Sequence, residues 1–184
     1  MWATRIDFSD PADNYSTITY THYVNAGALG GYLSGVVLTT PPPVATDPYV
    51  IWSGGDEPLL FDGDKNGDGV KNGLAFLLGA STPTSAVTLP TTTQSGGNLT
   101  LSFNMLKAAN RGLATLSVQH SRDLGISDPW TTVLVTDSNS GPTNGVTFVV
   151  TPGGGTTNGV TATISSSEAG GTGKLFGCLK ATAN

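Results

Sequence analysis

The chain has 184 residues and a formal net charge of -5 at pH 7, with 11% charged residues and 25 glycines. Because an average soluble domain carries about 25% charged residues, we expect a surface covered by hydroxyl groups rather than by charges. Its 8 basic residues are scattered along the chain, which excludes a basic stripe for nucleic acid. No run reaches the roughly 18 to 20 apolar residues that a membrane span needs.

Cysteine and turn composition favour an exported β protein. Cys178 is the single cysteine, so an internal disulfide and a cysteine-based zinc site are excluded, and we expect the thiol to be buried in the last strand. Abundant Thr suits half-buried strands, while Gly and Pro suit turns. Residues 1–5 lack the basic and apolar regions of a signal peptide. We therefore expect a mature form or a piece of a longer chain, located outside the cell or on its surface.

Residues 1–40 are predicted to form an N-terminal β-hairpin. Its first strand, 16–24, alternates bulky residues with threonine, and the Gly-rich segment 25–31 joins it to the second strand, 32–40. Two strands alone are marginal in water. The hairpin is therefore interpreted as the tail of a preceding β domain or as an arm used in assembly.

Residues 41–61 are predicted to be a Pro-rich linker followed by an aromatic segment. Three consecutive prolines, Pro41 to Pro43, remove backbone donors and favour an extended chain. The aromatic residues Tyr49, Trp52 and Phe61 follow and lead directly into an acidic loop.

The acidic loop opens the next unit, residues 62–80, and its oxygen atoms recur at alternate positions. Calcium prefers six to eight oxygen ligands, which a loop supplies from alternate side chains around a turn glycine. With Asp64 as position 1, Gly69 falls at position 6, where that glycine belongs. The predicted structural Ca²⁺ ligands are the side chains of Asp62, Asp64, Asn66, Asp68 and Asn72 and the carbonyl of Val70.

One ligand of the calcium pattern is missing. Ala75 stands at position 12, where a bidentate acid is expected, so Asp62, Asp56 or Glu57 must complete the shell or the affinity falls. A solvated turn without metal is the alternative. If calcium binds, we expect it to tie the linker to a short apolar helix over 73–78, which ends at Gly79.

Residues 81–184 are predicted to form the main domain. Apolar residues alternate in six segments separated by Asn, Gly, Pro and Asp clusters, which is typical of a small antiparallel β-sandwich of the immunoglobulin or fibronectin kind. The expected fold is therefore mainly β. The six segments are 99–105, 116–118, 130–135, 146–150, 160–164 and 175–181.

Two resemblances rest on these motifs. The Asp-x-Asn-x-Asp-Gly loop and its helix resemble dockerin and thrombospondin type 3 calcium repeats, although only one repeat is present. Over roughly residues 49–182, the chain resembles a C-terminal module of large secreted and cell-surface proteins of Verrucomicrobia and related bacteria. Its matching elements are the aromatic segment, the loop, the helix, Ser121 to Gly125 with Trp130, and the ending 174–182. That resemblance implies export and calcium binding.

The sequence favours a protein without enzymatic activity. His22 and His120 lie far apart on strand-like alternations, and the acids outside the loop occupy turns. The favoured hypothesis is a calcium-stabilised structural or assembly module of a cell-surface or filamentous structure, which associates with itself or with neighbouring domains. The alternative is a carbohydrate-binding or adhesion module appended to a secreted enzyme, with glycans held on Trp2, Trp52 or Trp130.

Overall fold

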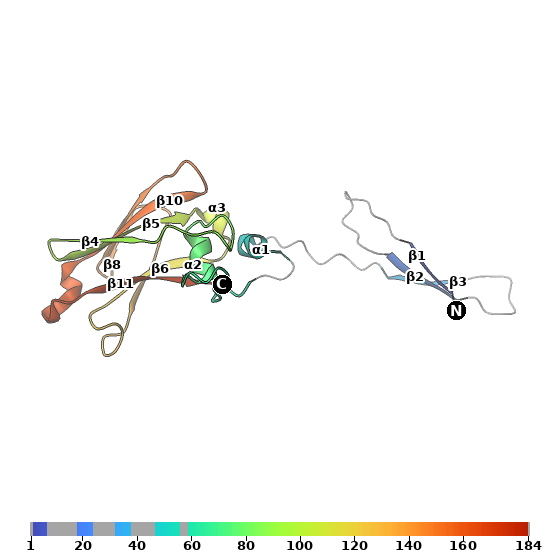
Figure 1. The fold of residues 1–184 in the computed structure, drawn as a ribbon, viewed down its shortest axis with the longest axis horizontal. Coiled ribbons are helices and arrows are strands. Elements are labelled where there is room, and N and C mark those ends of the chain that lie inside the picture. Colours follow the sequence, from blue (N-terminus) through green and yellow to red (C-terminus); the bar gives the residue numbers. More distant parts are fainter. Residues whose placement is uncertain (1, 7–17, 24–31, 38–46, 56–58, 184) are drawn as a thin grey trace. The chain divides into compact units, whose positions relative to one another are not determined.

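The computed structural model describes residues 2–6, 18–23, 32–37, 47–55 and 59–183 (Figure 1). It comprises two compact units, Met1–Thr46 and Asp47–Asn184. The Gly-rich segment 25–31 and the prolines of the expected linker lie outside the described residues.

The first unit is an antiparallel sheet of three strands in the order β1-β2-β3. Strands β2 (Ile18–Tyr23) and β3 (Tyr32–Val37) pair with each other, at the place where the sequence predicts a hairpin. Strand β1 (Trp2–Ile6) was not predicted and pairs with β2 from Trp2 opposite His22 to Ile6 opposite Ile18. With a third strand the sheet is larger than an isolated two-stranded hairpin, which is only marginally stable in water.

The second unit contains two antiparallel sheets, of five and three strands, so the prediction of a mainly β fold is confirmed. The chain passes from one sheet to the other between β5 and β6, between β7 and β8, and between β10 and β11. In spatial order the five-stranded sheet contains β4 (Thr91–Ser95), β5 (Asn98–Leu106), β10 (Thr157–Ile164), β9 (Val146–Thr151) and β8 (Ser140–Thr143). The three-stranded sheet contains β11 (Phe176–Thr182), β6 (Thr115–Ser121) and β7 (Thr131–Leu134).

Alternation along the strands places apolar side chains of both sheets in one core. In β10 every second residue is buried, with Ala162 and Ile164 fully enclosed. Because side chains in a strand point alternately to opposite faces, the residues between them form the outer face. The enclosed core side chains from the two sheets include Met105, Leu116, Val118, Val146, Phe148 and Val160.

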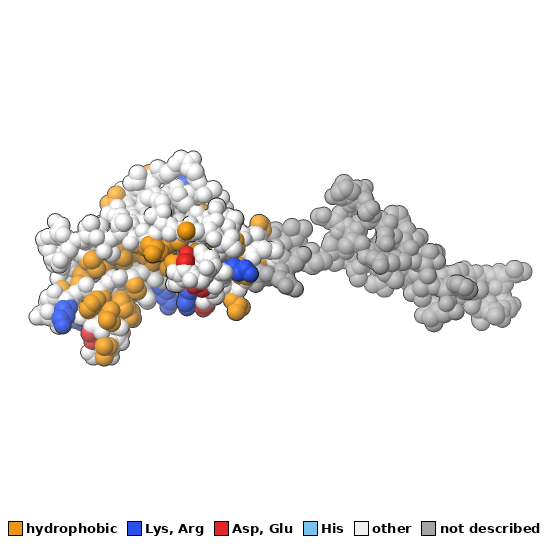
Figure 2. Space-filling model, in the orientation of Figure 1, with side chains coloured by type: hydrophobic (Ala, Val, Ile, Leu, Met, Phe, Trp, Pro, Cys, Tyr) orange, Lys and Arg blue, Asp and Glu red, His pale blue; other side chains and the backbone are white. Residues whose placement is uncertain are grey.

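The outer face of the five-stranded sheet carries hydroxyl groups. One row runs across four strands through Thr93, Thr100, Thr163 and Thr147, which are successive pairing partners. The part of the molecule that carries β4, β5 and β10 is mostly white in Figure 2, the colour of backbone and uncharged polar side chains. Threonine suits such a half-exposed pleated surface.

Strands β4 and β8 were not predicted, and both lie at the edges of their sheet. All residues of β4 are exposed, so it has no apolar alternation to reveal it. Strand β8 contains Gly141 and Pro142, which indicate a turn in a sequence but are tolerated on an edge strand.

Three short α-helices and one 3₁₀ helix complete the described part of the second unit. Helix α2 (Asn72–Leu77) lies within one residue of its predicted position, whereas α1 (Pro48–Ser53) was not predicted. Asp47 caps α1 by accepting a hydrogen bond of 2.7 Å from the Tyr49 amide. The others are α3 (Ala108–Arg111) and η1 (Ser166–Thr172). No helix among the described residues is long and apolar enough to cross a membrane.

Cys178 lies in the last strand as predicted, but the expectation that it is buried is wrong. It is half-buried, and its Sγ atom lies 3.9 Å from Gln119 Oε1 on the adjacent strand. Its neighbour Leu179 pairs with the enclosed Val118, so alternation turns Cys178 to the opposite face. Its partial burial raises the pKa of the thiol.

Replacing Leu77 tests the contribution of α2 to the core. Leu77 is fully enclosed, so Leu77→Ala should lower the free energy of unfolding by about 2–5 kcal/mol. Leu60→Ala is the matched control, since that side chain is 80% exposed, and it should change stability by less than about 0.5 kcal/mol. Urea unfolding followed by circular dichroism measures both, and equal effects would contradict the packing of α2.

Candidate metal site

The acidic loop is closed at its base by backbone hydrogen bonds. The Asn72 amide donates to the Gly63 carbonyl at 2.7 Å, and the Gly73 amide donates to the Phe61 carbonyl at 2.9 Å. The segment between these pairs forms one compact turn, which connects the aromatic segment to α2. These hydrogen bonds hold the two ends of the loop together.

Three predicted ligands come together inside this turn. Asp64 accepts hydrogen bonds from the Gly67 amide at 2.8 Å and the Gly69 amide at 2.9 Å. The amide group of Asn66 donates to Asp68 at 2.9 Å. Gly69, the turn glycine at position 6, has a φ of 85°, a left-handed conformation that glycine adopts without steric cost. The side-chain oxygens at positions 1, 3 and 5 thus line one small loop.

The other predicted ligands are placed differently. Asp62 forms an exposed ion pair with Lys71, with 3.1 Å between Oδ1 and Nζ. Asn72 is buried, and its side chain accepts from the Lys65 amide and donates to the Leu60 carbonyl, both at 2.9 Å. The side chain of Asn72 is therefore already used as a tie between two parts of the loop.

The last positions of the predicted ligand shell are Val70, Ala75 and the two candidate substitutes. Val70 is half-buried, and its amide donates to Asp68 at 2.8 Å. Ala75, at position 12, is buried in α2 and packs toward the interior. The candidate substitutes Asp56 and Glu57 lie outside the described residues.

The donor set fits a hard cation of the calcium type. Asp64, Asn66 and Asp68 offer carboxylate and amide oxygens, the ligands that Ca²⁺ prefers. These three side chains would supply part of the six to eight oxygen ligands that Ca²⁺ takes, and further side chains, backbone carbonyls or water would supply the rest.

An aromatic cluster beneath the loop links it to the core. The ring of Tyr49 lies 4.9 Å from that of Phe61 and 5.4 Å from that of Phe76, measured between centroids. Gly73 lies directly against Phe61, where an added Cβ atom would sit 2.1 Å from a ring carbon. Sequence reasoning did not predict these contacts, although the Asp47-Pro48 pair is a recognisable signal for the start of α1.

Burial and nearby charge also perturb this cluster. The Tyr49 hydroxyl donates to the Leu59 carbonyl at 3.0 Å. Burial, and secondly the negative charge of Asp62, raise the pKa of Tyr49. The loop and the aromatic cluster therefore form one connected structure.

A second ordered loop, residues 121–130, contains the Ser-x-Asp-Leu-Gly motif. Asp123 accepts hydrogen bonds from the amides of Ile126, Ser127 and Asp128 and from the Ser127 hydroxyl. The buried Ser121 hydroxyl donates to the Asp128 carbonyl at 2.8 Å. These bonds hold the exposed Leu124 and Ile126 at the loop tip. Hydrophobic side chains gather on the projecting loop at the lower left of Figure 2.

The motif also decides the place of Trp130. This side chain is half-buried and lies against Gly125, where an added Cβ atom would come within 2.6 Å of the indole. Trp130 therefore packs on the loop, outside the buried core.

Comparison with family models, with curated proteins and with solved structures finds no match for this chain.

Removing the side-chain amide of Asn72 tests whether its hydrogen bonds stabilise the loop. Asn72→Ala leaves the Leu60 carbonyl and the Lys65 amide without this partner, so it should cost about 1–3 kcal/mol even in chelator. Asn66→Ala is the control, because Asn66 is exposed, and in chelator it should change stability by less than about 0.5 kcal/mol. Urea unfolding measures both variants. Similar losses would show that Asn72 is no more structural than Asn66.

The loop containing Asp123 should make stability depend on acid pH. Hydrogen bonds from the Ser127 hydroxyl and then from backbone amides lower the pKa of Asp123 well below its ordinary range, and bonding to Arg122 lowers that of Asp128. Each lowered pKa stabilises the fold above the unfolded-state value of about 3.9. This contribution is lost as the pH falls toward the folded-state value.

Asp123→Asn should therefore flatten the decline of stability below about pH 4. Ser127→Ala removes the donor with the largest effect on Asp123 and should produce a smaller change in the same direction. The measurement is the urea midpoint as a function of pH. Unaltered profiles in both variants would refute this role of the loop.

Proposed function

We propose that the second unit is an immunoglobulin/fibronectin-like β-sandwich stabilised by a structural Ca²⁺, serving as a non-enzymatic extracellular structural or assembly module. The strand order supports the sandwich. Strands β4, β5, β10 and β9 follow the order A, B, E, D of an immunoglobulin sheet, and β11 and β6 correspond to F and C of the facing sheet.

The observation that carries the calcium proposal is the convergence of Asp64, Asn66 and Asp68 in one turn directly before α2. The backbone amides of Gly67 and Gly69 donate hydrogen bonds to Asp64. Asp64 and Asp68 are two negatively charged side chains in the same small loop. A divalent cation would offset their repulsion and bind oxygens of the type it prefers. Calcium is favoured over zinc because the loop has no imidazole or thiolate.

Calcium at this position would act on the fold through α2. The helix begins at Asn72, and its residues Phe76 and Leu77 enter the shared core. A cation that binds the folded loop better than the unfolded chain adds its binding free energy to the stability of the fold. The proposed role is therefore structural and requires no open coordination position.

Two features support a structural or assembly role over an enzymatic one. His120 is buried, and its Nε2 atom lies 3.0 Å from the Asn144 carbonyl, so it has a packing role. Strands β4 and β8 bound one sheet, and β7 and β11 bound the other. Unpaired strand edges are the elements by which β proteins join other chains, which favours self-association or contact with neighbouring domains.

Thermal unfolding with calcium and with chelator tests the proposal. Calcium at about 100 times its dissociation constant should stabilise the fold by about 2.7 kcal/mol, which corresponds to a rise in Tm of several degrees. Asp64→Asn and Asp68→Asn should remove most of this shift. Asp137→Asn should retain it whatever its own stability, because Asp137 pairs with Arg111 outside the loop.

Asp62→Ala tests whether Asp62 is a calcium ligand. Since Asp62 pairs with Lys71, this variant should keep most of the calcium shift unless Asp62 turns to complete the shell. Light scattering in the same two buffers reports the size of any assembly. A Tm that is equal in calcium and chelator for the unaltered chain would reduce the loop to a polar turn.

A further inference from the structure

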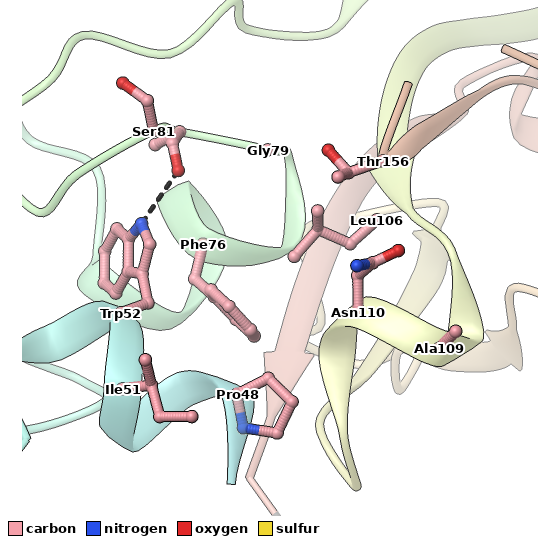
Figure 3. A pocket seen from close by; sticks show the side chains of 11 residues that line it. Pro48, Ile51, Trp52, Phe76, Gly79, Ser81, Leu106, Ala109, Asn110 and Thr156 are labelled. Carbon is pink, nitrogen blue, oxygen red and sulfur yellow. Dashed lines mark hydrogen bonds between the residues drawn. The ribbon is translucent and has the colours of Figure 1, made fainter. Parts of the chain in front are cut away.

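A cavity of about 440 Å³ lies beside the aromatic cluster, within the range of small-molecule sites (Figure 3). Four parts of the second unit line this open pocket: α1, the end of α2 with the residues after it, the junction of β5 with α3, and the chain before β10. Trp52 and Ile51 stand on one side, and Leu106 and Asn110 stand on the other.

Close contacts hold the first two walls in place. The Trp52 indole N–H donates to the Ala80 carbonyl at 2.8 Å, which ties α1 to the segment after α2. An added Cβ atom at Gly79 would lie 2.6 Å from Thr157 on β10. Gly79 also has a φ of 92°, so glycine is needed here both for space and for conformation.

The other two walls are also anchored. Gly112, which ends α3, lies so close to Pro48 that an added Cβ atom would come within 2.8 Å of its ring. The Arg111 guanidinium donates to both oxygens of Asp137, at 2.8 and 2.6 Å. The Lys107 amide donates to the Thr156 carbonyl at 2.9 Å. The cavity is therefore built into the packing rather than left between mobile segments.

The lining is uncharged and mostly apolar, with a few polar side chains. The indole of Trp52, the ring of Pro48 and the 61% exposed side chain of Ile51 form an apolar wall. The amide of Asn110 and the hydroxyl of Thr156 lie opposite this wall, beside Leu106, and are exposed. Neither side chain forms a hydrogen bond with another described residue, so both are available to a ligand.

We propose that this cavity binds one neutral pyranose unit of a polysaccharide. A pyranose ring has an apolar C–H face, which packs on an indole or proline ring, and an edge of hydroxyl groups, which bond to an amide and a hydroxyl. The uncharged lining offers no partner for a phosphate, a sulfate or a uronic acid carboxylate. A purely apolar occupant would leave the Asn110 amide unused.

The sugar site is distinct from the metal loop. Its wall includes Phe76 and the end of α2, but its polar groups, Asn110 and Thr156, lie on other elements. Sugar binding therefore goes beyond the proposed calcium role, and the two proposals can fail separately.

NMR titration of the whole chain tests the site directly. The probes are neutral cello-, xylo-, manno- and chito-oligosaccharides of two to four units, added at millimolar concentration in calcium and again in chelator. We expect at least one series to shift the Trp52 indole N–H and the Asn110 side-chain amide signals. An absent calcium response with these sugar shifts retained would reject the metal proposal and keep the sugar site.

Matched variants locate the binding. Asn110→Ala should weaken the affinity about three- to tenfold, as expected for a lost hydrogen bond, and Ile51→Ala should weaken it by reducing the apolar wall. Both residues are exposed, so the fold should be retained. Asn104→Ala is the control, since this exposed asparagine lies on the outer face of the five-stranded sheet. The affinity of this variant for the sugar should be unchanged.

Three results would overturn the inference. The first is that no sugar of the four series shifts the Trp52 and Asn110 signals. The second is that the Trp52 shift and the affinity are the same in Asn110→Ala and in the unaltered chain. The third is that 1-hexanol shifts these signals while no sugar does, which would make the cavity an apolar docking site.

Discussion

Phe76, Leu77 and Leu78 pack into the core that the two sheets share, and most other features of the second unit depend on this contact. Helix α2 is only six residues long, far below the length at which an isolated helix is stable in water. It exists because its apolar face is buried. The helix in turn holds the end of the acidic loop, the base of the aromatic cluster and one wall of the cavity.

Glycine makes the close packing around this helix possible. Gly73 allows the Phe61 ring to lie against the start of α2, and Gly79 allows its end to approach Thr157. A side chain at either position would force the loop or the helix away from the sheets. The positions of the loop before α2 and of the cavity beside it therefore both depend on how this short helix packs against the sheets.

The polar parts of the molecule follow a different rule. The acidic loop and the 121–130 loop are both organised by aspartates that accept hydrogen bonds from backbone amides, Asp64 in the first and Asp123 in the second. Each loop also contains an ion pair, between Asp62 and Lys71 in the first and between Asp128 and Arg122 in the second.

The sequence by itself determined the mainly β fold, six of the eight strands of the second unit, and α2, because apolar alternation and a glycine stop are local signals. The local spacing of oxygen-bearing residues also predicted a calcium site in the acidic loop, and that stays a prediction. The exposed edge strands β4 and β8 have no such signal. Only tertiary structure turned Asn72 into a buried tie, paired Asp62 with Lys71, and gathered Trp52, Leu106 and Asn110 around one cavity. The cavity depends on contacts between residues distant along the chain, and the two loop contacts depend on how the loop is folded, neither of which the spacing of residue types encodes.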